Sequence, residues 1–326
     1  MRVLLCLRQN CYKYYSADTQ QCQKIYKFLK NRNIQVDINN GGKCDFSKYD
    51  VVHLFDLNST GEMYKYYKEA VRNKCDIVIS PLYWNYERYF KFNKKIESIK
   101  LWKRCNLYRG EILKKSKRVI CSSQTEMEFL NRDFGKINGE VIYYGSDIEY
   151  DDIPLYSFKG RYNLDKYVLC VARINPIKNQ KTLVDITEKL GMSLVLVGNI
   201  DDKNYFGECM KKEHVKYFGF FDSYNIYNAY RFAEVHAVPG FCEMPGISTL
   251  EAAGSGCKVL TSSEGCANEY LKDKAYYCNP FNPEDIENKL IEALNGRKSN
   301  VLKLYVQQRF KWEKYGESIL KIYESL

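Results

Sequence analysis

Residues 235–262 are VHAVPGFCEMPGISTLEAAGSGCKVLTS, a segment in which an apolar run ends at Pro239-Gly240 and a polar loop follows. After the loop, the pattern predicts a helix over 248–254 and a second buried strand over 257–261. Strand, loop, helix and strand together make a βαβ unit. In such units ligands bind where the loops leave the strand ends. We therefore expect a parallel α/β sheet with a ligand site at this loop.

Two carboxylates in this segment suit a ligand that carries both hydroxyls and phosphates. Glu243 lies in the loop, and Glu251 lies eight positions later in the predicted helix. Between them, Gly246 lets backbone N–H groups approach a ligand, and the helix N-terminus favours an anion. Carboxylates accept hydrogen bonds from sugar hydroxyls. For Glu251 a second interpretation stays open, because Ser248 and Glu251 also fit a capping box that needs no ligand.

Length and composition indicate a two-domain globular protein. The chain has 326 residues, of which 45% are hydrophobic, and contains no apolar run long enough for a transmembrane helix. Its beginning, MRVLLCLRQ, is too short in apolar residues for a signal peptide and predicts a first strand. The 13 cysteines include no C-x-x-C pair. Several lie in apolar runs (Cys6, Cys121 and Cys170), which is typical of reduced thiols in a cytosolic protein.

The positive charge is concentrated in the first half. Residues 1–150 hold 27 Lys and Arg against 17 Asp and Glu, whereas residues 151–326 hold 23 of each. The segment 88–118 alone has 12 basic and two acidic residues. Aromatic and apolar side chains alternate with them: Tyr89, Phe90, Phe92, Leu101, Trp102 and Tyr108. Three interpretations stay open, namely a solvated helix face, a contact with anionic lipid and a nucleic-acid interface.

Each half of the chain alternates strand and helix patterns, as a doubly wound, largely parallel sheet does. In the first half the predicted strands are 2–8, 34–38, 49–54, 76–80, 117–122 and 140–144, and the helices are 19–32, 62–73, 94–115 and 123–133. Residues 147–160 are polar and are predicted to form a linker. In the second half the strands are 167–172, 193–197, 215–219, 235–238, 257–261 and 275–278, and the helices are 178–190, 224–232, 248–254, 283–295 and a long terminal helix over 301–326.

The dehydrogenase class is disfavoured, because no glycine follows Cys6 in the first strand-to-helix turn and the G-x-G-x-x-G fingerprint is absent. Polar groups instead follow three strands of the second half. Arg173 and Lys178 follow the first, Gly198-Asn199 the second, and the glutamate loop the third. A diphosphate suits two such cations, since Arg binds it bidentately and Lys acts as a point charge.

In this order the groups resemble the retaining nucleotide-sugar glycosyltransferases of family 4, which have the GT-B fold. The family pattern R-x4-K, V-G, and E-x7-E followed by A-x-G corresponds here to Arg173 and Lys178, Val197-Gly198, and Glu243 and Glu251 followed by AAGSGCKVLTS. Similarity continues through GCANEYL, which contains Glu269, to WEKYGESILKIYE, so that it covers roughly 167–326 and is fainter before it.

The resemblance implies two Rossmann-like doubly wound domains facing a cleft. An acceptor-side domain would comprise 1–148 together with a terminal helix from about 305 to 326 that crosses back to it, and a donor domain would comprise 149–304. Arg173, Lys178 and Glu243 would be the catalytic residues. The first two would bind the diphosphate and stabilise its departure, and Glu243 would hold the hydroxyls of the transferred sugar. Glu251 would bind the ribose. The implied donor-binding set is Arg173, Lys178, Gly198, Asn199, Glu243, Met244, Pro245, Gly246, Ile247, Ser248 and Glu251.

The first domain departs from the family pattern where an acceptor would bind. Ser16-Ala17 stand before Asp18 in place of a Gly-Gly loop, and Ser80-Pro81-Leu82-Tyr83 stand where the family often has a histidine. Tyr144-Gly145 replaces the family's N-G. The implied acceptor-side residues are Asp18, His53, Ser80 and Tyr83. A strand histidine such as His53 is also commonly a core residue.

We therefore expect a cytoplasmic glycosyltransferase that moves a hexose-type sugar, with retention, from a UDP- or GDP-sugar to a glycan or lipid-linked acceptor. Neither a metal site nor a cofactor is expected, and segment 88–118 would touch the inner membrane face. The alternative is a catalytically weak or inactive nucleotide-sugar-binding or scaffold protein. A nucleic-acid binder is disfavoured, because the donor constellation would then have no purpose.

Overall fold

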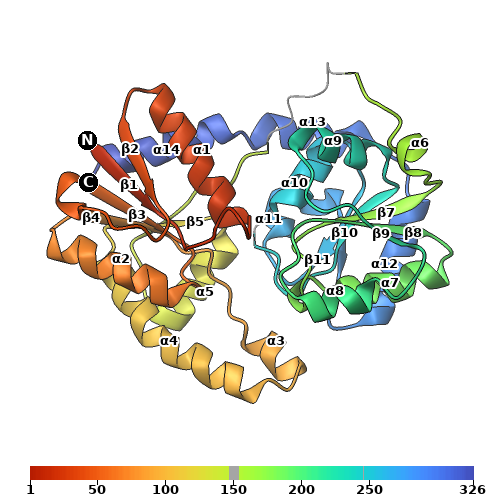
Figure 1. The fold of residues 1–326 in the computed structure, drawn as a ribbon, viewed down its shortest axis with the longest axis horizontal. Coiled ribbons are helices and arrows are strands. Elements are labelled where there is room, and N and C mark those ends of the chain that lie inside the picture. Colours follow the sequence, from red (N-terminus) through yellow and green to blue (C-terminus); the bar gives the residue numbers. More distant parts are fainter. Residues whose placement is uncertain (147–153, 245) are drawn as a thin grey trace. The chain divides into compact units, whose positions relative to one another are not determined.

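Each half of the chain builds one six-stranded parallel sheet. The computed structural model describes residues 1–146, 154–244 and 246–326 (Figure 1). Unit 1 comprises Met1–Gly145 and Trp312–Leu326, and unit 2 comprises Ser146–Lys311. The predicted boundary between 148 and 149, and the first half of the predicted linker, lie outside the described residues. The two-sheet α/β architecture expected from the sequence is confirmed.

In unit 1 the sheet has the order β2-β1-β3-β4-β5-β6, and every neighbouring pair is parallel. Its strands are β1 (Arg2–Cys6), β2 (Gln35–Asn39), β3 (Val51–Phe55), β4 (Asp76–Ser80), β5 (Arg118–Cys121) and β6 (Gly139–Val141). Its helices are α1 (Ala17–Asn31), α2 (Thr60–Arg72), α3 (Glu87–Phe92), α4 (Ile96–Lys115), α5 (Gln124–Phe134) and α14 (Trp312–Glu324), with a 3-10 turn η1 (Phe46–Lys48). Helices α1 and α14 lie side by side (Figure 1).

Unit 2 has the order β12-β11-β10-β7-β8-β9, again all parallel. Its strands are β7 (Tyr167–Val171), β8 (Ser193–Val197), β9 (Val215–Tyr217), β10 (Val235–Val238), β11 (Val259–Ser262) and β12 (Tyr276–Cys278). Its helices are α6 (Phe158–Tyr162), α7 (Gln180–Lys189), α8 (Lys203–Cys209), α9 (Ser223–Phe232), α10 (Ile247–Gly254), α11 (Ala267–Leu271), α12 (Pro283–Asn295) and α13 (Asn300–Arg309), with 3-10 turns η2 (Pro176–Lys178) and η3 (Lys272–Lys274). Strands β7 and β10 are apolar almost throughout because helices cover both faces of a parallel sheet.

The predicted single helix over 301–326 is wrong. It is broken between α13 and α14 at Phe310, whose backbone is extended, with φ −110° and ψ 91°. The Phe310 ring packs on Tyr270, with centroids 5.1 Å apart, and its carbonyl accepts the Ser146 N–H. The chain therefore returns to unit 1 at Trp312 rather than near 305. Short helices α3 and α8 were also not predicted, and α6 begins inside the predicted linker.

The order of strands reverses at one place in each sheet. In unit 2 the chain winds from β7 to β8 and β9 on one side, and from β10 to β11 and β12 on the other. In unit 1 the corresponding reversal separates β1 from β3. Ligands of open α/β sheets bind outside the carboxyl ends of the strands at such a switch point. We therefore expect the ligand site of unit 2 at the loops after β7 and β10.

Candidate functional site

Two residues predicted from distant motifs are in direct contact at the switch point of unit 2. Lys178 ends the 3-10 turn η2 after β7, where the Asn175 side chain accepts its backbone N–H at 3.2 Å. Glu243 lies in the loop after β10. The Lys178 Nζ atom lies 2.8 Å from Glu243 Oε1. Because both loops leave the same edge of the sheet, two residues that are 65 positions apart in the sequence form one ion pair.

The Glu243 carboxyl lies in the interior, since the residue is 1% exposed. Its backbone pairs with the segment after β11, because its N–H donates to Glu264 O and its carbonyl accepts the Cys266 N–H, both at 3.2 Å. A Cβ on Gly240 would collide with Oε1 of this carboxylate, so a larger residue at that position would force the carboxylate to move. Burial raises the pKa of Glu243, and the positive charges of Lys178 and Arg173 act in the opposite direction.

Arg173 lies beside Asp201, which sequence reasoning did not single out. The guanidinium Nη1 is 3.0 Å from Asp201 Oδ2, and that oxygen also accepts from the Asn175 side chain at 3.0 Å. The two loops that carry these residues are joined by a bridge between Ile174 and Ile200. Gly198 holds them close: its φ is +140°, and a Cβ there would lie 2.8 Å from the carbonyl carbon of Ala172. Asn199 contributes a backbone carbonyl, which accepts the Ile174 N–H at 2.8 Å.

Helix α10 begins at Ile247, and its N-cap residue Gly246 has no side chain to cap the first N–H groups. The alternative capping box of Ser248 and Glu251 is therefore not formed, since Ser248 already lies inside the first turn. The first N–H groups of a helix have no intrahelical acceptor and suit an anion. Met244 is half-buried and Ile247 is buried beside this terminus. Pro245 lies outside the described residues.

Glu251 lies one turn further along α10, half-buried, next to the buried Tyr230 of α9. Burial raises the pKa of Tyr230 well above its ordinary value, and the Glu251 carboxylate adds to this effect by its charge and by hydrogen bonding. Glu251 therefore lies on the side of α10 that faces α9.

In unit 1 the predicted acceptor-side residue Asp18 lies at the switch point of the sheet. It is 1% exposed, and Arg8 Nε, after β1, donates to its Oδ2 at 2.8 Å. Asp56 follows β3 with a φ of +69°. Burial, with the charge of Asp18 as the next cause, raises the pKa of Asp56 to about 6. Arg8 and Asp56 were missed from the sequence, because single charged residues in loops carry no pattern.

The other three predicted acceptor-side residues, His53, Ser80 and Tyr83, are buried in unit 1. His53 is fully buried, with Nδ1 2.6 Å from the Tyr323 hydroxyl of α14 and Nε2 2.9 Å from Ser80 Oγ. Tyr83 is also fully buried, and its hydroxyl donates to Asp133 at 2.7 Å. Their polar atoms are occupied by protein partners. This agrees with the alternative interpretation of His53 as a core residue, and we leave these three out of the candidate site.

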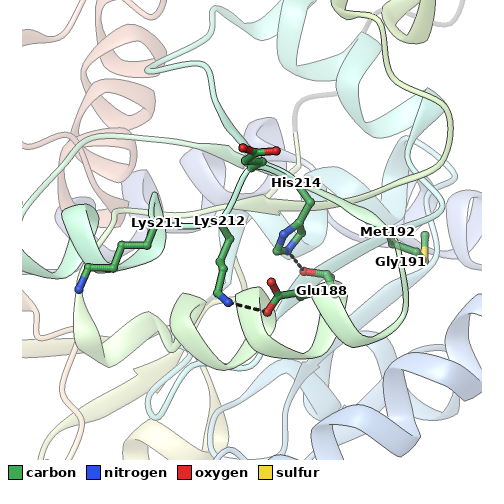
Figure 2. A pocket seen from close by; sticks show the side chains of 8 residues that line it. Glu188, Gly191, Met192, Lys211, Lys212 and His214 are labelled. Carbon is green, nitrogen blue, oxygen red and sulfur yellow. Dashed lines mark hydrogen bonds and ion pairs between the residues drawn. The ribbon is translucent and has the colours of Figure 1, made fainter.

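A separate hollow of about 390 Å³ lies at the opposite edge of the unit 2 sheet, between the end of α7 and the turn before β9 (Figure 2). Its lysines are paired within the protein, Lys212 with Glu188 at 2.9 Å and Lys211 with Glu208 at 2.6 Å. His214 Nε2 lies 3.1 Å from both the Thr187 hydroxyl and the Val184 carbonyl. Because it borders the amino ends of β8 and β9, this hollow is remote from the loops that carry Lys178 and Glu243.

Within the described residues, no three His, Cys, Asp or Glu side chains are grouped as metal ligands. All 13 cysteines are free thiols. In that same part of the chain, every helix is too short or too polar to span a bilayer.

The family model described as "Glycosyl transferases group 1" matches residues 156–317, which include both switch-point loops of unit 2. Residues 156–317 are therefore similar to a glycosyltransferase group 1 domain. A glycosyltransferase of Methanocaldococcus jannaschii, itself uncharacterized, is 25% identical over 185 residues. That alignment spans 53% of this chain and 45% of the relative, so less than half of the relative is matched.

Solved structures show the fold over the whole chain. Sucrose-phosphate synthase from Thermosynechococcus elongatus has a TM-score of 0.79 at 15% identity, covering 100% of this chain and 98% of that one. Anabaena HepE, solved in complex with UDP-glucose, has a TM-score of 0.78 at 16% identity, and both chains are covered completely. WaaG, a glycosyltransferase involved in lipopolysaccharide biosynthesis, has a TM-score of 0.73 at 14% identity, with 98% and 99% covered. The fold is therefore GT-B, and together with the domain match it supports a glycosyltransferase.

Proposed function

We propose that the chain transfers a hexose-type sugar, with retention of configuration, from a nucleotide-diphosphate sugar to an acceptor hydroxyl, as a member of the retaining family 4. The observation that carries the proposal is the contact between Lys178 and Glu243 at the switch point of unit 2, within the region similar to a group 1 domain, with Arg173 on the same loop as Lys178. A cation for the diphosphate and a carboxylate for the sugar hydroxyls thus lie side by side. The complex of HepE with UDP-glucose supports this class of donor.

Departure of a nucleoside diphosphate builds up negative charge, which preorganised cations and helix N-termini stabilise. Arg173, Lys178 and the first N–H groups of α10 would neutralise that charge without a divalent metal or a cofactor. Glu243 would hold the hydroxyls of the transferred sugar, and Glu251 would accept from the ribose hydroxyls. The donor is a UDP- or GDP-sugar in this proposal.

The test begins with a thermal-shift screen against UDP-, GDP-, ADP- and dTDP-sugars, since a ligand that binds only the folded form raises the melting temperature. Donor turnover, including hydrolysis, is then compared in the wild type and in Glu243→Ala, for which we expect a loss on the order of a hundredfold in kcat/KM. Lys181→Met, an exposed lysine of α7, is the matched control and should leave turnover unchanged. Unchanged turnover in Glu243→Ala would contradict the assignment.

A second candidate function is a nucleotide-sugar-binding or scaffold protein with little or no catalysis. The observation that favours it is the burial of His53, Ser80 and Tyr83, which leaves Asp18 as the remaining predicted acceptor residue. A wild type that binds a nucleotide sugar but turns over none of a broad acceptor panel would support this candidate over the enzyme.

The acceptor in this proposal is a glycan or a lipid-linked glycan. Helices α3 and α4 would contact the cytoplasmic face of the membrane that holds it. Helix α4 packs against α2 and α3 and buries Trp102 and Arg109. Its outer side exposes large apolar side chains: Leu107 is 79% exposed and Leu101 63% exposed. Basic residues flank them (Lys100, Lys103, Arg104, Lys114 and Lys115). Apolar side chains that enter the headgroup layer and cations that meet anionic lipid give peripheral binding.

Vesicle co-sedimentation tests this contact with neutral phosphatidylcholine vesicles and with vesicles that also contain phosphatidylglycerol. Binding should require the anionic lipid and should weaken in the double variant Leu101→Gln and Leu107→Gln, whose positions lie on the outside of the helix. Equal binding to both vesicle types would count against it. Absence of vesicle binding, together with nucleic-acid affinity that falls steeply with salt, would favour the nucleic-acid alternative.

A further inference from the structure

The ion pair of Lys178 and Glu243 joins a partly accessible cation to an inaccessible carboxylate. The Lys178 side chain is 20% exposed, and the Glu243 side chain, 2.8 Å away, is 2% exposed. Lys178 can therefore turn towards a ligand in the loop cluster, which leaves the Glu243 carboxylate open on the side that Lys178 covered. A ligand that draws Lys178 away leaves the buried Glu243 carboxylate without its ion-pair partner.

Few charged or titratable groups face Glu243 besides Lys178. Arg173 acts on it from a greater distance and is engaged with Asp201. The Cys170 thiol of β7 and the Cys278 thiol of β12 also feel its charge, and burial raises the pKa of both thiols so that they remain neutral. Within the described residues, Lys178 makes the direct ion pair that compensates this carboxylate.

The two halves of a nucleotide-sugar donor would act on this pair differently. The diphosphate competes with Glu243 for Lys178, while sugar hydroxyls can donate hydrogen bonds to the carboxylate that Lys178 leaves. A free nucleoside diphosphate brings the competing anion but no hydroxyl for that position. A buried carboxylate without a cation or a donor is strongly unfavourable and is relieved by protonation.

We infer that the Lys178–Glu243 pair couples phosphate recognition to sugar recognition: the intact donor binds with Glu243 ionised, whereas a free nucleoside diphosphate binds together with one proton on Glu243. The inference rests on the proposed function, since it assigns the diphosphate to Lys178 and the sugar to Glu243. The proton comes from solvent, adds to the carboxylate and returns to solvent when the nucleotide leaves. The pair thus favours the intact donor over the spent nucleotide as the pH rises.

The sign of the pH effect follows from linkage. Removing Lys178 from Glu243 raises the pKa of the carboxyl in the nucleotide complex above its value in the free protein, so protonation favours the complex. The dissociation constant of the free nucleotide should therefore rise with pH, by up to about tenfold per pH unit between those two pKa values. The dissociation constant of the nucleotide sugar should stay nearly constant over the same range.

Isothermal titration calorimetry measures the proton count directly. UDP and UDP-glucose are titrated into the full chain at pH 7.5 in Hepes and in Tris, which differ in ionisation enthalpy; GDP with GDP-mannose and ADP with ADP-glucose are used in the same way. At this pH the terminal phosphate of the free nucleotide is already ionised, since such a group has a pKa of about 6. We expect an uptake of up to one proton with the diphosphate and none with the matching nucleotide sugar.

Glu243→Gln removes the titrating group and should bring the proton count of the diphosphate close to zero, while Lys181→Met should behave as the wild type does. Equal proton counts for diphosphate and nucleotide sugar in the wild type would overturn the coupling. So would an extra proton that persists in Glu243→Gln, because another group would then carry it. If the wild type binds none of the three pairs, the proposed function itself fails. The pH series on the wild type needs no variant and decides the question even if Glu243→Gln does not fold.

Discussion

At the scale of single residues, Gly240 determines whether Glu243 can lie beneath Lys178. An added Cβ would overlap Glu243 Oε1 and stand 3.1 Å from its Cδ and 3.3 Å from the Ile177 carbonyl. Gly240→Ala should therefore push the carboxylate out of its ion pair and lower donor kcat/KM at least about tenfold. Overpacking of this kind costs about 1–3 kcal/mol of unfolding free energy, so the variant should still fold. Donor turnover and a urea unfolding curve measure the two effects.

Gly207→Ala is the matched control for this prediction. Gly207 lies in α8 of the same unit with open space around the position of a Cβ. Alanine in a helix interior is more favourable than glycine by roughly 0.5–1 kcal/mol, so this variant should be slightly more stable and fully active. If Gly240→Ala retains wild-type turnover, the placement of Glu243 against Lys178 is not needed for catalysis.

His236 on β10 makes the stability of unit 2 depend on pH. Burial lowers the pKa of His236 to about 3, from an ordinary value near 6.5. Below pH 6.5 the unfolded chain binds a proton that the folded chain does not, so the free energy of unfolding falls as the pH falls, by about 1.4 kcal/mol per pH unit. Between pH 7 and 5, His236→Leu should lose about 2 kcal/mol less than the wild type in urea unfolding. Parallel losses in both proteins would contradict this.

The sequence predicted that the proposed donor residues of unit 2 lie together at the strand ends, but not how they pair. Arg173, Lys178 and Glu243 belong to recognisable motifs at strand ends, and parallel strands bring such ends to one edge. Their partners depend on loop conformation. Asp201 and Gly240 show this, because each acts through a contact that no local pattern encodes. The structure places His53, Ser80 and Tyr83 in the core of unit 1, where their side chains have protein partners that no local pattern in the sequence indicates.

At the scale of elements, continuous apolar runs made the buried parallel strands predictable. Apolar residues at the helical spacing of three and four positions made the long helices predictable. Helices α3 and α8, with six and seven residues, are too short to show that periodicity. The break between α13 and α14 was missed because neither proline nor glycine marks it. There the Phe310 ring finds its partners in unit 2, so tertiary packing overrides a helical pattern.

The docking of α14 against α1 yields a prediction at this scale. A Cβ on Gly316 would lie 2.9 Å from Cδ1 of Phe28 and closer still to other atoms of that ring. Gly316→Ala should separate the two helices and lower the unfolding free energy of unit 1 by about 1–3 kcal/mol. Lys314→Ala, on the exposed side of α14, should change it by less than about 0.5 kcal/mol. Urea unfolding followed by tryptophan fluorescence compares them, and equal midpoints would show that the helices adjust without cost.

At the scale of the whole molecule, both chain termini lie in unit 1, because α14 belongs to it. The three tryptophans follow the same division: Trp84, Trp102 and Trp312 all lie in unit 1, and residues 146–311 contain none. The proposed donor residues all lie in unit 2. Tryptophan fluorescence therefore reports the half of the molecule that holds none of them.

This division makes the place of donor binding measurable without a crystal. A nucleotide sugar at a hundred times its dissociation constant should stabilise the unit that binds it by about 2.7 kcal/mol. Thermal unfolding followed by circular dichroism should then show a raised transition for unit 2, and the shift should vanish in Glu243→Ala. The tryptophan transition should move by less, because the ligand contacts assigned to Arg173, Lys178 and Glu251 stabilise unit 2 directly. A nucleotide sugar that raises the tryptophan transition alone would place the donor in unit 1 and contradict the assignment of these residues.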